Sequence, residues 1–546
     1  MQPLETRSQA AVEAIVETRW GRVRGHREGD SLVFRGIPFA APPVGELRWL
    51  PPRLPLPWSG VRDSVEDAAA ACQNPSSLMA LTGWAPSRPD SEDCLALNVF
   101  TPAADAGRRA VFVWIHGGGY TSGTGAQSAY DGHSLVARGD VVVVNINYRL
   151  GALGFLALEA LREREGGALG NLGVFDQVAA LEWVRDHIEA FGGDPSRVTI
   201  AGESAGASAV ATLLAVPKAR PLFDRAILQS GHAFNTSWPE AMLETGERFA
   251  HAAGVKPRAV DDLVALPVEK ILAAQAHVVA NNPDGAWCMS FEPCVDESLV
   301  ETMPIDAIAK GSVADKALLA GTNLDEMKLF ALNDPEVASI DEARFLRRFD
   351  RILASPKTRG HDESRPLLDA YRNAMPGASL SDLWWAMESD RRMRVPTLRT
   401  LEAASLHSSH NYSYLFTWPS VAFGGLAGSC HALEIPFVFG THHQDWARPL
   451  IGEGKDVETL VERIQRSWIA FTCEGSPETD DARGWIGYEA GKRATGILGK
   501  DFGVEEAPLE ARRRAWDAIS EVRDRWTLAR QQAGSASRQA PRVENA

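Results

Sequence analysis

The stretch that decides the fold is residues 198–216, which read VTIAGESAGASAVATLLAV. Its first four residues predict a short buried strand, and the small-residue run from Ala207 to Val216 predicts a helix. Between them stands Gly202-Glu203-Ser204-Ala205-Gly206, a G-x-S-x-G pattern. A serine at such a strand-to-helix turn has a strained backbone, which is tolerated only if the neighbours two residues away lack side chains. The pattern therefore predicts that Ser204 is an exposed nucleophile at a helix N-terminus.

Further strands and helices alternate on the N-terminal side of this turn. Residues 110–115 (AVFVWI) and 140–146 (DVVVVNI) are nearly all apolar, as strands buried on both faces are. Residues 174–191 place apolar side chains at helical spacing, and the GGDP of residues 192–195 ends that helix. This order predicts an α/β sheet with parallel pairing. Beyond residue 232 only 316–321 (KALLAG) resembles another such strand, so we expect helical insertions and a sheet completed later in the chain.

A glycine cluster follows the strand at 110–115. It reads His116-Gly117-Gly118-Gly119-Tyr120, and glycines let backbone N–H groups converge on one oxygen. We expect an oxyanion hole made by the amides of Gly118, Gly119 and Ala205. A phosphate-binding loop is the alternative, but no Gly-Lys-Ser/Thr follows and no G-x-G-x-x-G stands at the required place.

A nucleophilic serine also needs a base and an acid that orients the base. Of the 13 histidines, His431 ranks first because it follows a glycine-rich loop well downstream of Ser204. The acid should lie between these two residues after a strand, where Asp325 and Glu326 stand side by side. Adjacent side chains point apart, so only one of the two can orient the imidazole. The residues alone do not choose between them.

Composition excludes several classes of protein. The 546 residues carry 56 Lys and Arg against 71 Asp and Glu, a net charge of −15, which argues against a nucleic-acid partner. The apolar runs are far shorter than the roughly 18 to 20 residues that span a bilayer. The first twenty residues contain several charges and lack the apolar core of a secretory signal, so we expect a cytoplasmic location.

The cysteines do not form a disulfide scaffold or a zinc motif. Six are present, and Cys72 and Cys94 could close one loop. The other four lack paired short spacings and are expected to be buried thiols. We expect one α/β domain over residues 1–530 and a disordered tail over residues 531–546, which has almost no large apolar residues.

Motifs spread from about residue 16 to 525 make the chain resemble the type-B carboxylesterase family, a branch of the α/β-hydrolases that includes cholinesterases. Beside the glycine and serine motifs above, they are FRGIPFA at 34–40, PPVG at 42–45, SEDCLALNV at 91–99, NYRLG at 147–151, GNLG at 170–173 with Asp176-Gln177, FGGDP at 191–195, QSG at 229–231, and the Asp325-Glu326 and His431 segments.

This resemblance implies an α/β-hydrolase fold, with a mostly parallel central sheet flanked by helices and with helical insertions that form a gorge or cap. It implies a triad of Ser204, Glu326 and His431, which selects Glu326 over Asp325. It further implies a disulfide between Cys72 and Cys94, which a reducing cytosol would keep open. Ion pairs of Arg48 with Glu92 and of Arg149 with Asp176 are implied as supports of the fold.

The chain also departs from the family pattern. Met327 stands where many relatives have Gly after the acid, Ala207 replaces a common Gly, and His187 takes an Asn position. We expect none of the three to touch a catalytic group. Trp84 stands where cholinesterases stack a tryptophan on choline, with a packing role as the simpler interpretation.

The expected function is hydrolysis of small to medium, and by family likeness bulky, carboxylic esters through an acyl-enzyme, without metal or cofactor. Acyl transfer and hydrolysis of carbamates or amides are alternatives on the same triad. A non-catalytic interaction domain is disfavoured because the three triad residues are all retained. Trp84, Tyr120 and Phe330, followed by Trp287, Phe291 and Phe423, are the candidates for the pocket wall. Nothing in the sequence indicates the oligomeric state.

Overall fold

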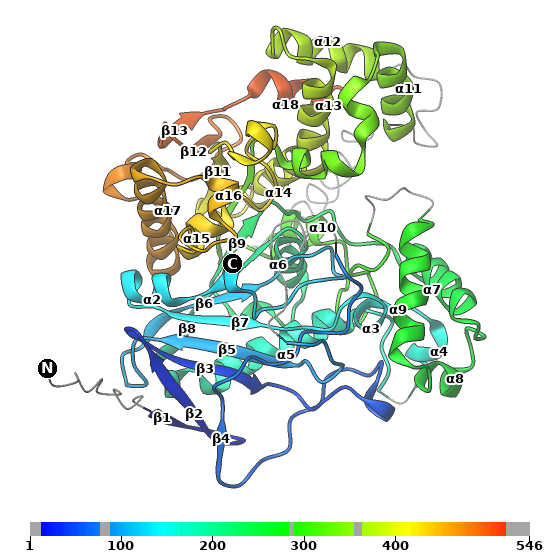
Figure 1. Ribbon diagram of the computed structural model, residues 1–546, viewed down its shortest axis with the longest axis vertical. Helices are drawn as coiled ribbons and strands as arrows, with labels where there is room; N and C mark the ends of the chain where they lie inside the picture. The colour runs from blue at the N-terminus through cyan, green and yellow to red at the C-terminus, as the bar shows by residue number, and fades with distance from the viewer. Residues whose placement is uncertain (1–12, 77–87, 165, 283–288, 354–362, 520–546) are drawn as a thin grey trace, which may run out of the picture.

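A thirteen-stranded sheet organises the computed structural model, which describes residues 13–76, 88–164, 166–282, 289–353 and 363–519 (Figure 1). The strands pair in the order β1-β2-β3-β5-β7-β6-β8-β9-β10-β11-β12-β13, and β4 pairs with β2 beside this path. In chain order they are β1 (Glu13–Thr18), β2 (Gly21–Glu28), β3 (Ser31–Pro38), β4 (Val61–Asp63), β5 (Ala96–Thr101), β6 (Arg109–Ile115), β7 (Val142–Ile146), β8 (Gly193–Glu203), β9 (Arg225–Gln229), β10 (Ala317–Asn323), β11 (Asn411–Phe416), β12 (Ala494–Leu498) and β13 (Gly503–Glu506).

The centre of the sheet is parallel, as the sequence predicts. The pairs from β7 through β6, β8, β9, β10 and β11 to β12 all run in parallel. The two ends are antiparallel, with β1, β2, β3 and β5 at one edge and β13 at the other. Sequence analysis did not find the N-terminal strands, and in β1 and β2 polar residues that face solvent dilute the apolar signal. The prediction that later segments complete the sheet is confirmed by β11 to β13.

The helices cover both faces of this sheet. The α-helices are α2 (His133–Gly139), α3 (Gly151–Phe155), α4 (Glu159–Arg162), α5 (Leu172–His187), α6 (Ala205–Ala215), α7 (Pro239–Ala253), α8 (Val260–Val264), α9 (Val268–Ala280), α10 (Pro304–Ala309), α11 (Glu342–Leu353), α12 (Ser364–Ala374), α13 (Leu380–Ser389), α14 (Val395–Ala404), α15 (Ile435–Phe439), α16 (Arg448–Ile451), α17 (Lys455–Glu474) and α18 (Glu510–Asp517). Short turns of other helix types are η1 (Gly45–Leu47), η2 (Ser128–Tyr130), η3 (Ile188–Phe191), η4 (Arg220–Leu222), η5 (Glu326–Asn333), η6 (Pro335–Ser339), η7 (Asp390–Arg394), η8 (Ala422–Gly425) and η9 (Asp480–Ala482).

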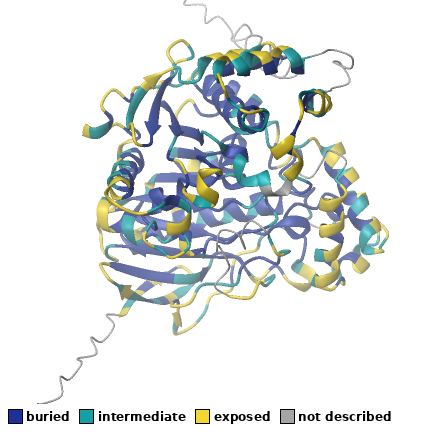
Figure 2. Cartoon of the chain, turned by 45° about the horizontal axis from the view of Figure 1, so that its top comes forward, coloured by how far each residue is buried: buried dark blue, intermediate teal, exposed yellow. Residues whose placement is uncertain are grey.

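Alternate residues of the central strands build two separate cores. On β6, Val111, Val113 and Ile115 pack with α5 and α6, whereas Phe112 and Trp114 pack with α15 and α17 on the other face. This division follows from the period of two in a strand, and it explains why β6 is apolar from Ala110 to Ile115. Figure 2 shows the buried central strands between these layers.

The later helices extend beyond the sheet. In Figure 1, α11, α12, α13 and α18 form a group at one end, with a core of its own, and α7, α8 and α9 lie at another side. They confirm the expected helical insertions. Within the part of the chain that the structure describes, no helix has the length and apolarity needed to cross a membrane. The tail expected at 531–546 lies outside the described residues.

A buried ion pair ties the segment after β7 to α5. Arg149 donates from Nε and Nη2 to the two oxygens of Asp176, at 2.8 and 2.7 Å, and both side chains are almost completely buried. The second pair that the resemblance implies is also present, because Arg48 donates to both oxygens of Glu92 at 2.6 and 2.5 Å. Both pairs lie away from Ser204 and act as supports of the fold.

We predict that Asp176→Ala lowers the free energy of unfolding by about 3–5 kcal/mol, because it leaves the guanidinium of Arg149 buried without its carboxylate. Urea unfolding followed by tryptophan fluorescence would measure the change. Asp480→Ala is the matched control, because its pair with Arg483 is exposed and should contribute less than about 1 kcal/mol. Equal losses in the two variants would contradict the assignment of Asp176 as a buried support.

Candidate active site

Ser204 stands at the turn between β8 and α6, as its motif predicts. Its backbone has φ 57° and ψ −122°, a strained conformation for a residue with a side chain. The flanking glycines are required by packing. A Cβ on Gly206 would lie 2.1 Å from the carbonyl oxygen of Ile115, and one on Gly202 would lie 2.5 Å from the backbone of Gly206. The turn therefore has this shape because β6, β8 and α6 approach one another at backbone distance.

The glycine loop after β6 lies directly against Ser204. A Cβ on Gly117 would be 3.2 Å from the Cβ of Ser204. Two carbonyls of the loop are fixed by hydrogen bonds: that of Gly117 accepts from His116 Nδ1 at 2.9 Å, and that of Gly118 accepts from the amide and hydroxyl of Ser122, each at 3.1 Å.

These two carbonyls determine where the amides of Gly118 and Gly119 point. In a trans peptide the N–H points opposite to the C=O of the same plane. The N–H groups of Gly118 and Gly119 are thus directed away from His116 and Ser122. Ala205 is the first residue of α6, so its amide has no partner within the helix. The three amides proposed from the sequence belong to backbone that is fixed in place around Ser204.

His116 serves this loop as a neutral donor. Burial lowers the pKa of its imidazole to about 4, so the ring is uncharged at neutral pH. Its ring stacks on Tyr148 with 4.5 Å between centroids, and the Tyr148 hydroxyl donates to the His116 carbonyl at 2.8 Å. His116 is therefore a structural residue of the glycine loop.

Glu326, not Asp325, contacts His431. Glu326 Oε2 lies 2.6 Å from His431 Nδ1, and both side chains are buried although 105 residues separate them. Asp325 accepts the amide of Ser429 at 3.0 Å and pairs with Lys328 at 3.1 Å. The two adjacent carboxylates thus have different roles. Glu326 contacts the imidazole of His431, and Asp325 binds the loop from which His431 extends.

A second carboxylate, which sequence analysis missed, faces the other nitrogen of the ring. Glu203 Oε1 lies 3.1 Å from His431 Nε2. Burial raises the pKa of Glu203 to about 8. Burial alone would lower the pKa of His431, but Glu203, Glu326 and Glu434 outweigh it and raise that pKa to about 10. The signal for Glu203 was its place in the serine motif, one residue before the nucleophile.

A buried polar network supports Glu326 from behind. Asn323 donates its amide N–H to Glu326 Oε1 at 2.8 Å and its side-chain amide to Glu434 Oε2 at 2.7 Å. Gln229 donates to the other oxygen of Glu434 at 3.0 Å and accepts from Trp468 Nε1 at 3.0 Å. Because rigid neighbours satisfy both carboxylates, the orientation of Glu326 is fixed before any ligand binds.

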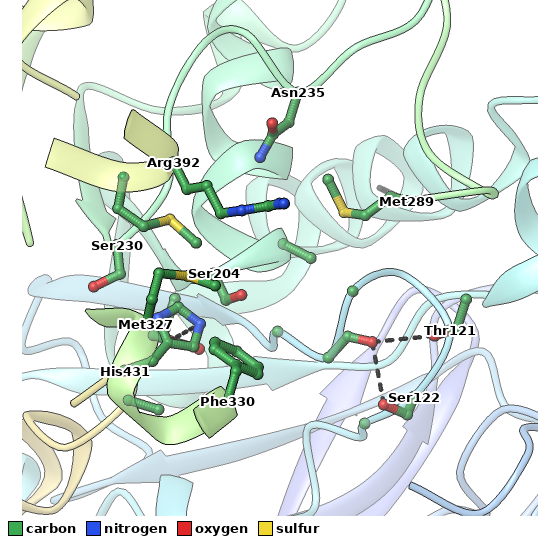
Figure 3. Close-up of a pocket in the computed structure, with 18 of the residues that line it drawn as sticks. Thr121, Ser122, Ser204, Ser230, Asn235, Met289, Met327, Phe330, Arg392 and His431 are labelled. Atoms are coloured by element: carbon green, nitrogen blue, oxygen red, sulfur yellow. Dashed lines mark hydrogen bonds and ion pairs between the residues drawn. The ribbon is translucent and has the colours of Figure 1, made fainter. Parts of the chain in front are cut away.

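Ser204, His431 and the glycine loop open into a cavity of about 890 Å³ (Figure 3). Phe330 lines it and packs on His431 with 5.6 Å between ring centroids. Met327, one of the three departures from the family pattern, lines it as well. The remaining wall comes mainly from α9, α14 and η7.

The structure places the other predicted pocket residues elsewhere. Tyr120 is fully buried against Phe155 and belongs to the core, which corrects its assignment to the pocket wall. Phe291 is also a core residue, and the half-exposed Phe423 lies outside the lining of the cavity. Trp84 and Trp287 lie outside the described residues. An aromatic residue near a motif can face either way, and the sequence does not indicate which.

Cys72 and Cys94 are free thiols in the structure, so the disulfide that the family resemblance implies is not formed in it. Both are buried and line the same small cavity, and burial raises the pKa of each thiol. Among the described residues, no group of three or more His, Cys, Asp or Glu side chains is arranged to hold a metal ion.

Comparison with known proteins agrees with this geometry. The model of the Carboxylesterase family matches residues 12–514. Para-nitrobenzyl esterase of Bacillus subtilis (strain 168) is 35% identical over 92% of this chain and 98% of its own length. Phenmedipham hydrolase of Pseudarthrobacter oxydans is 33% identical over 90% of this chain and 96% of its own. The solved carboxylesterase EST55 of Geobacillus stearothermophilus superposes with a TM-score of 0.82 at 35% identity, over 92% of this chain and 99% of that one.

Proposed function

We propose, from the premise that this chain belongs to the carboxylesterase family and is an esterase with the α/β-hydrolase fold, that Ser204 is its nucleophile. In this proposal His431 is the base, and Glu326 is the acid that orients it. The observation that carries the proposal is the 2.6 Å contact between Glu326 and the Nδ1 of a His431 that lines the same cavity as Ser204. That contact fixes the tautomer in which Nε2 is left to accept a proton.

In the first half-reaction His431 Nε2 takes the proton of the Ser204 hydroxyl as the oxygen attacks the ester carbonyl. The carbonyl oxygen becomes an oxyanion, which the amides of Gly118, Gly119 and Ala205 stabilise. The C–O bond to the alcohol then breaks, and His431 gives its proton to the departing oxygen. The product is an acyl-enzyme on Ser204 and a free alcohol.

In the second half-reaction water replaces the alcohol. His431 takes a proton from the water, which attacks the acyl carbon, and returns it to Ser204 as the acid leaves. The size of the cavity, about 890 Å³, fits esters of small to medium size. Every group that takes part in this proposed hydrolysis, apart from the ester and water, is a triad side chain or one of the three backbone amides named above.

We predict that Ser204→Ala lowers kcat for 4-nitrophenyl acetate by up to about 10⁶-fold, because the triad members act as a unit. Circular dichroism and thermal unfolding would check that the variant folds. Ser208→Ala, one turn further along α6, is the matched control and should change kcat by less than about tenfold. A fluorophosphonate probe followed by peptide mapping should label Ser204. Label at another residue, or wild-type rates in Ser204→Ala, would overturn the assignment.

We predict that Glu203→Gln shifts the acidic limb of the kcat/KM–pH profile to lower pH, by about one unit or more. The neighbouring carboxylate raises the pKa of His431, and the base must be unprotonated to act. Removing that charge lets the ring lose its proton at lower pH. The profile would be measured with an uncharged ester.

Glu292→Gln is the control for this shift. Burial raises the pKa of Glu292 to about 7, but this carboxyl binds Ser237 and does not line the cavity. Its replacement should leave the acidic limb in place. An unchanged limb in Glu203→Gln, or a shift to higher pH, would contradict the role of Glu203.

A further inference from the structure

Three methionines line the cavity that holds Ser204, and one of them, Met327, adjoins the triad. It is the second residue of η5, directly after Glu326, and its backbone N–H donates to the Ser389 hydroxyl at 3.0 Å. Its side chain packs with the separate core that α11, α12, α13 and α18 share. Only 3% of the residue is exposed, so packing holds Met327 in place on the cavity wall.

The thioether of Met327 is directed at the reacting groups. Figure 3 shows its side chain passing beside the imidazole of His431 toward Ser204, whereas Met289 lies on the far side of Ser204. A methionine sulfur is polarisable and apolar in character, and it is only a weak hydrogen-bond acceptor. In its reduced form Met327 therefore does not compete with His431 for the proton of the Ser204 hydroxyl.

Oxidation changes this property of the sulfur. A hydroperoxide transfers one oxygen to a thioether: the sulfur gives up two electrons, the O–O bond breaks, and the proton of the transferred oxygen leaves with the other oxygen as water or an alcohol. The sulfoxide that remains is polar and carries an accepting oxygen. On Met327 this oxygen would be directed toward Ser204 and His431, and a hydrogen bond to it would hold the proton that His431 has to take.

The oxidant reaches this sulfur through the cavity and not through the outer surface. Met242 has the same exposed fraction as Met327, 3%, but it packs in a core with Leu169 and Cys294 and does not line the cavity. H₂O₂ is little larger than a water molecule, and a cavity of about 890 Å³ has room for it. The two methionines are therefore equally buried but differ in their access to a small oxidant.

The cysteine next to the triad is protected from the same oxidant. Cys430 precedes His431 in sequence, but it packs in the core that contains α15 and α17 and does not line the cavity. Burial raises the pKa of its thiol to about 12, and peroxides react with the thiolate. Because little thiolate is present at neutral pH, Met327 is the more reactive of the two sulfur atoms.

We propose that Met327 is an oxidation-sensitive modification site and that its conversion to the sulfoxide by a hydroperoxide inactivates the enzyme. The inference rests on the proposed function of Ser204 and names a regulation of the same site. The step is reversible, because a methionine sulfoxide reductase with a pair of thiols as electron donors releases the oxygen as water and leaves a disulfide.

The test is to treat the purified protein with H₂O₂ and to follow hydrolysis of 4-nitrophenyl acetate together with the oxidation of each methionine by peptide mass spectrometry. In the wild type kcat/KM should fall about tenfold or more, in proportion to the fraction of Met327 that gains one oxygen atom. Met242 should stay reduced. Met327→Leu, a substitution of similar volume, should keep most of the activity of its own untreated sample.

Met289→Leu is the matched control, because Met289 also lines the cavity but lies on the far side of Ser204, so this variant should lose activity as the wild type does. Dithiothreitol alone reduces disulfides and sulfenic acids but not sulfoxides, so it should not restore activity. The proportionality in the wild type decides the question even if Met327→Leu does not fold.

Several results would overturn the inference and leave the proposed function standing. They are a Met327 that stays reduced, a wild type that keeps its activity with Met327 oxidised, a Met327→Leu variant that is inactivated like the wild type, and recovery with dithiothreitol alone. If the untreated wild type does not hydrolyse the ester, the proposed function is wrong as well.

Discussion

The backbone contact between α6 and the end of β6 is the constraint on which the site depends. A Cβ on Gly206 would come within 2.1 Å of the Ile115 oxygen and 2.8 Å of the His116 oxygen, so the helix can approach this closely only without a side chain there. The same contact fixes two things at once. It sets the turn that carries Ser204, and it places the loop that begins at His116 against that turn. If α6 moved outward to admit a larger residue, the amide of Ala205 would separate from those of Gly118 and Gly119.

The second constraint is electrostatic and surrounds one imidazole. Glu326 and Glu203 face the two nitrogens of His431, and Glu434 lies behind them with its oxygens satisfied by Asn323 and Gln229. In a buried site such charges interact more strongly than in water. The carboxylates are already in place before the reaction, so they stabilise the imidazolium as it forms without having to reorient. The arrangement has a cost at every pH below the raised pKa of His431, because the same carboxylates favour a protonated ring that cannot act as a base.

Local features of the fold could be predicted from the sequence because a few neighbouring residues determine them. The strand, turn and helix around Ser204 need only an apolar run, two glycines and a small-residue helix, and the structure has all three. The choice of Glu326 over Asp325 came from family likeness, since two adjacent carboxylates differ only in which way the backbone points them. The pocket wall was not predictable in this way, because Tyr120 faces the core and Met327 faces the cavity for reasons of packing.

The π-helical turn η7 (Asp390–Arg394) forms part of the cavity wall and shows why that wall could not be predicted from the sequence. Pro396 alone would suggest a helix end or a kink, and nothing near it in sequence indicates that His232 satisfies the carbonyl that the proline leaves without its helical partner. The contact that satisfies this carbonyl spans 160 residues of sequence, so the position of η7 at the cavity wall depends on the tertiary fold and not on a local pattern.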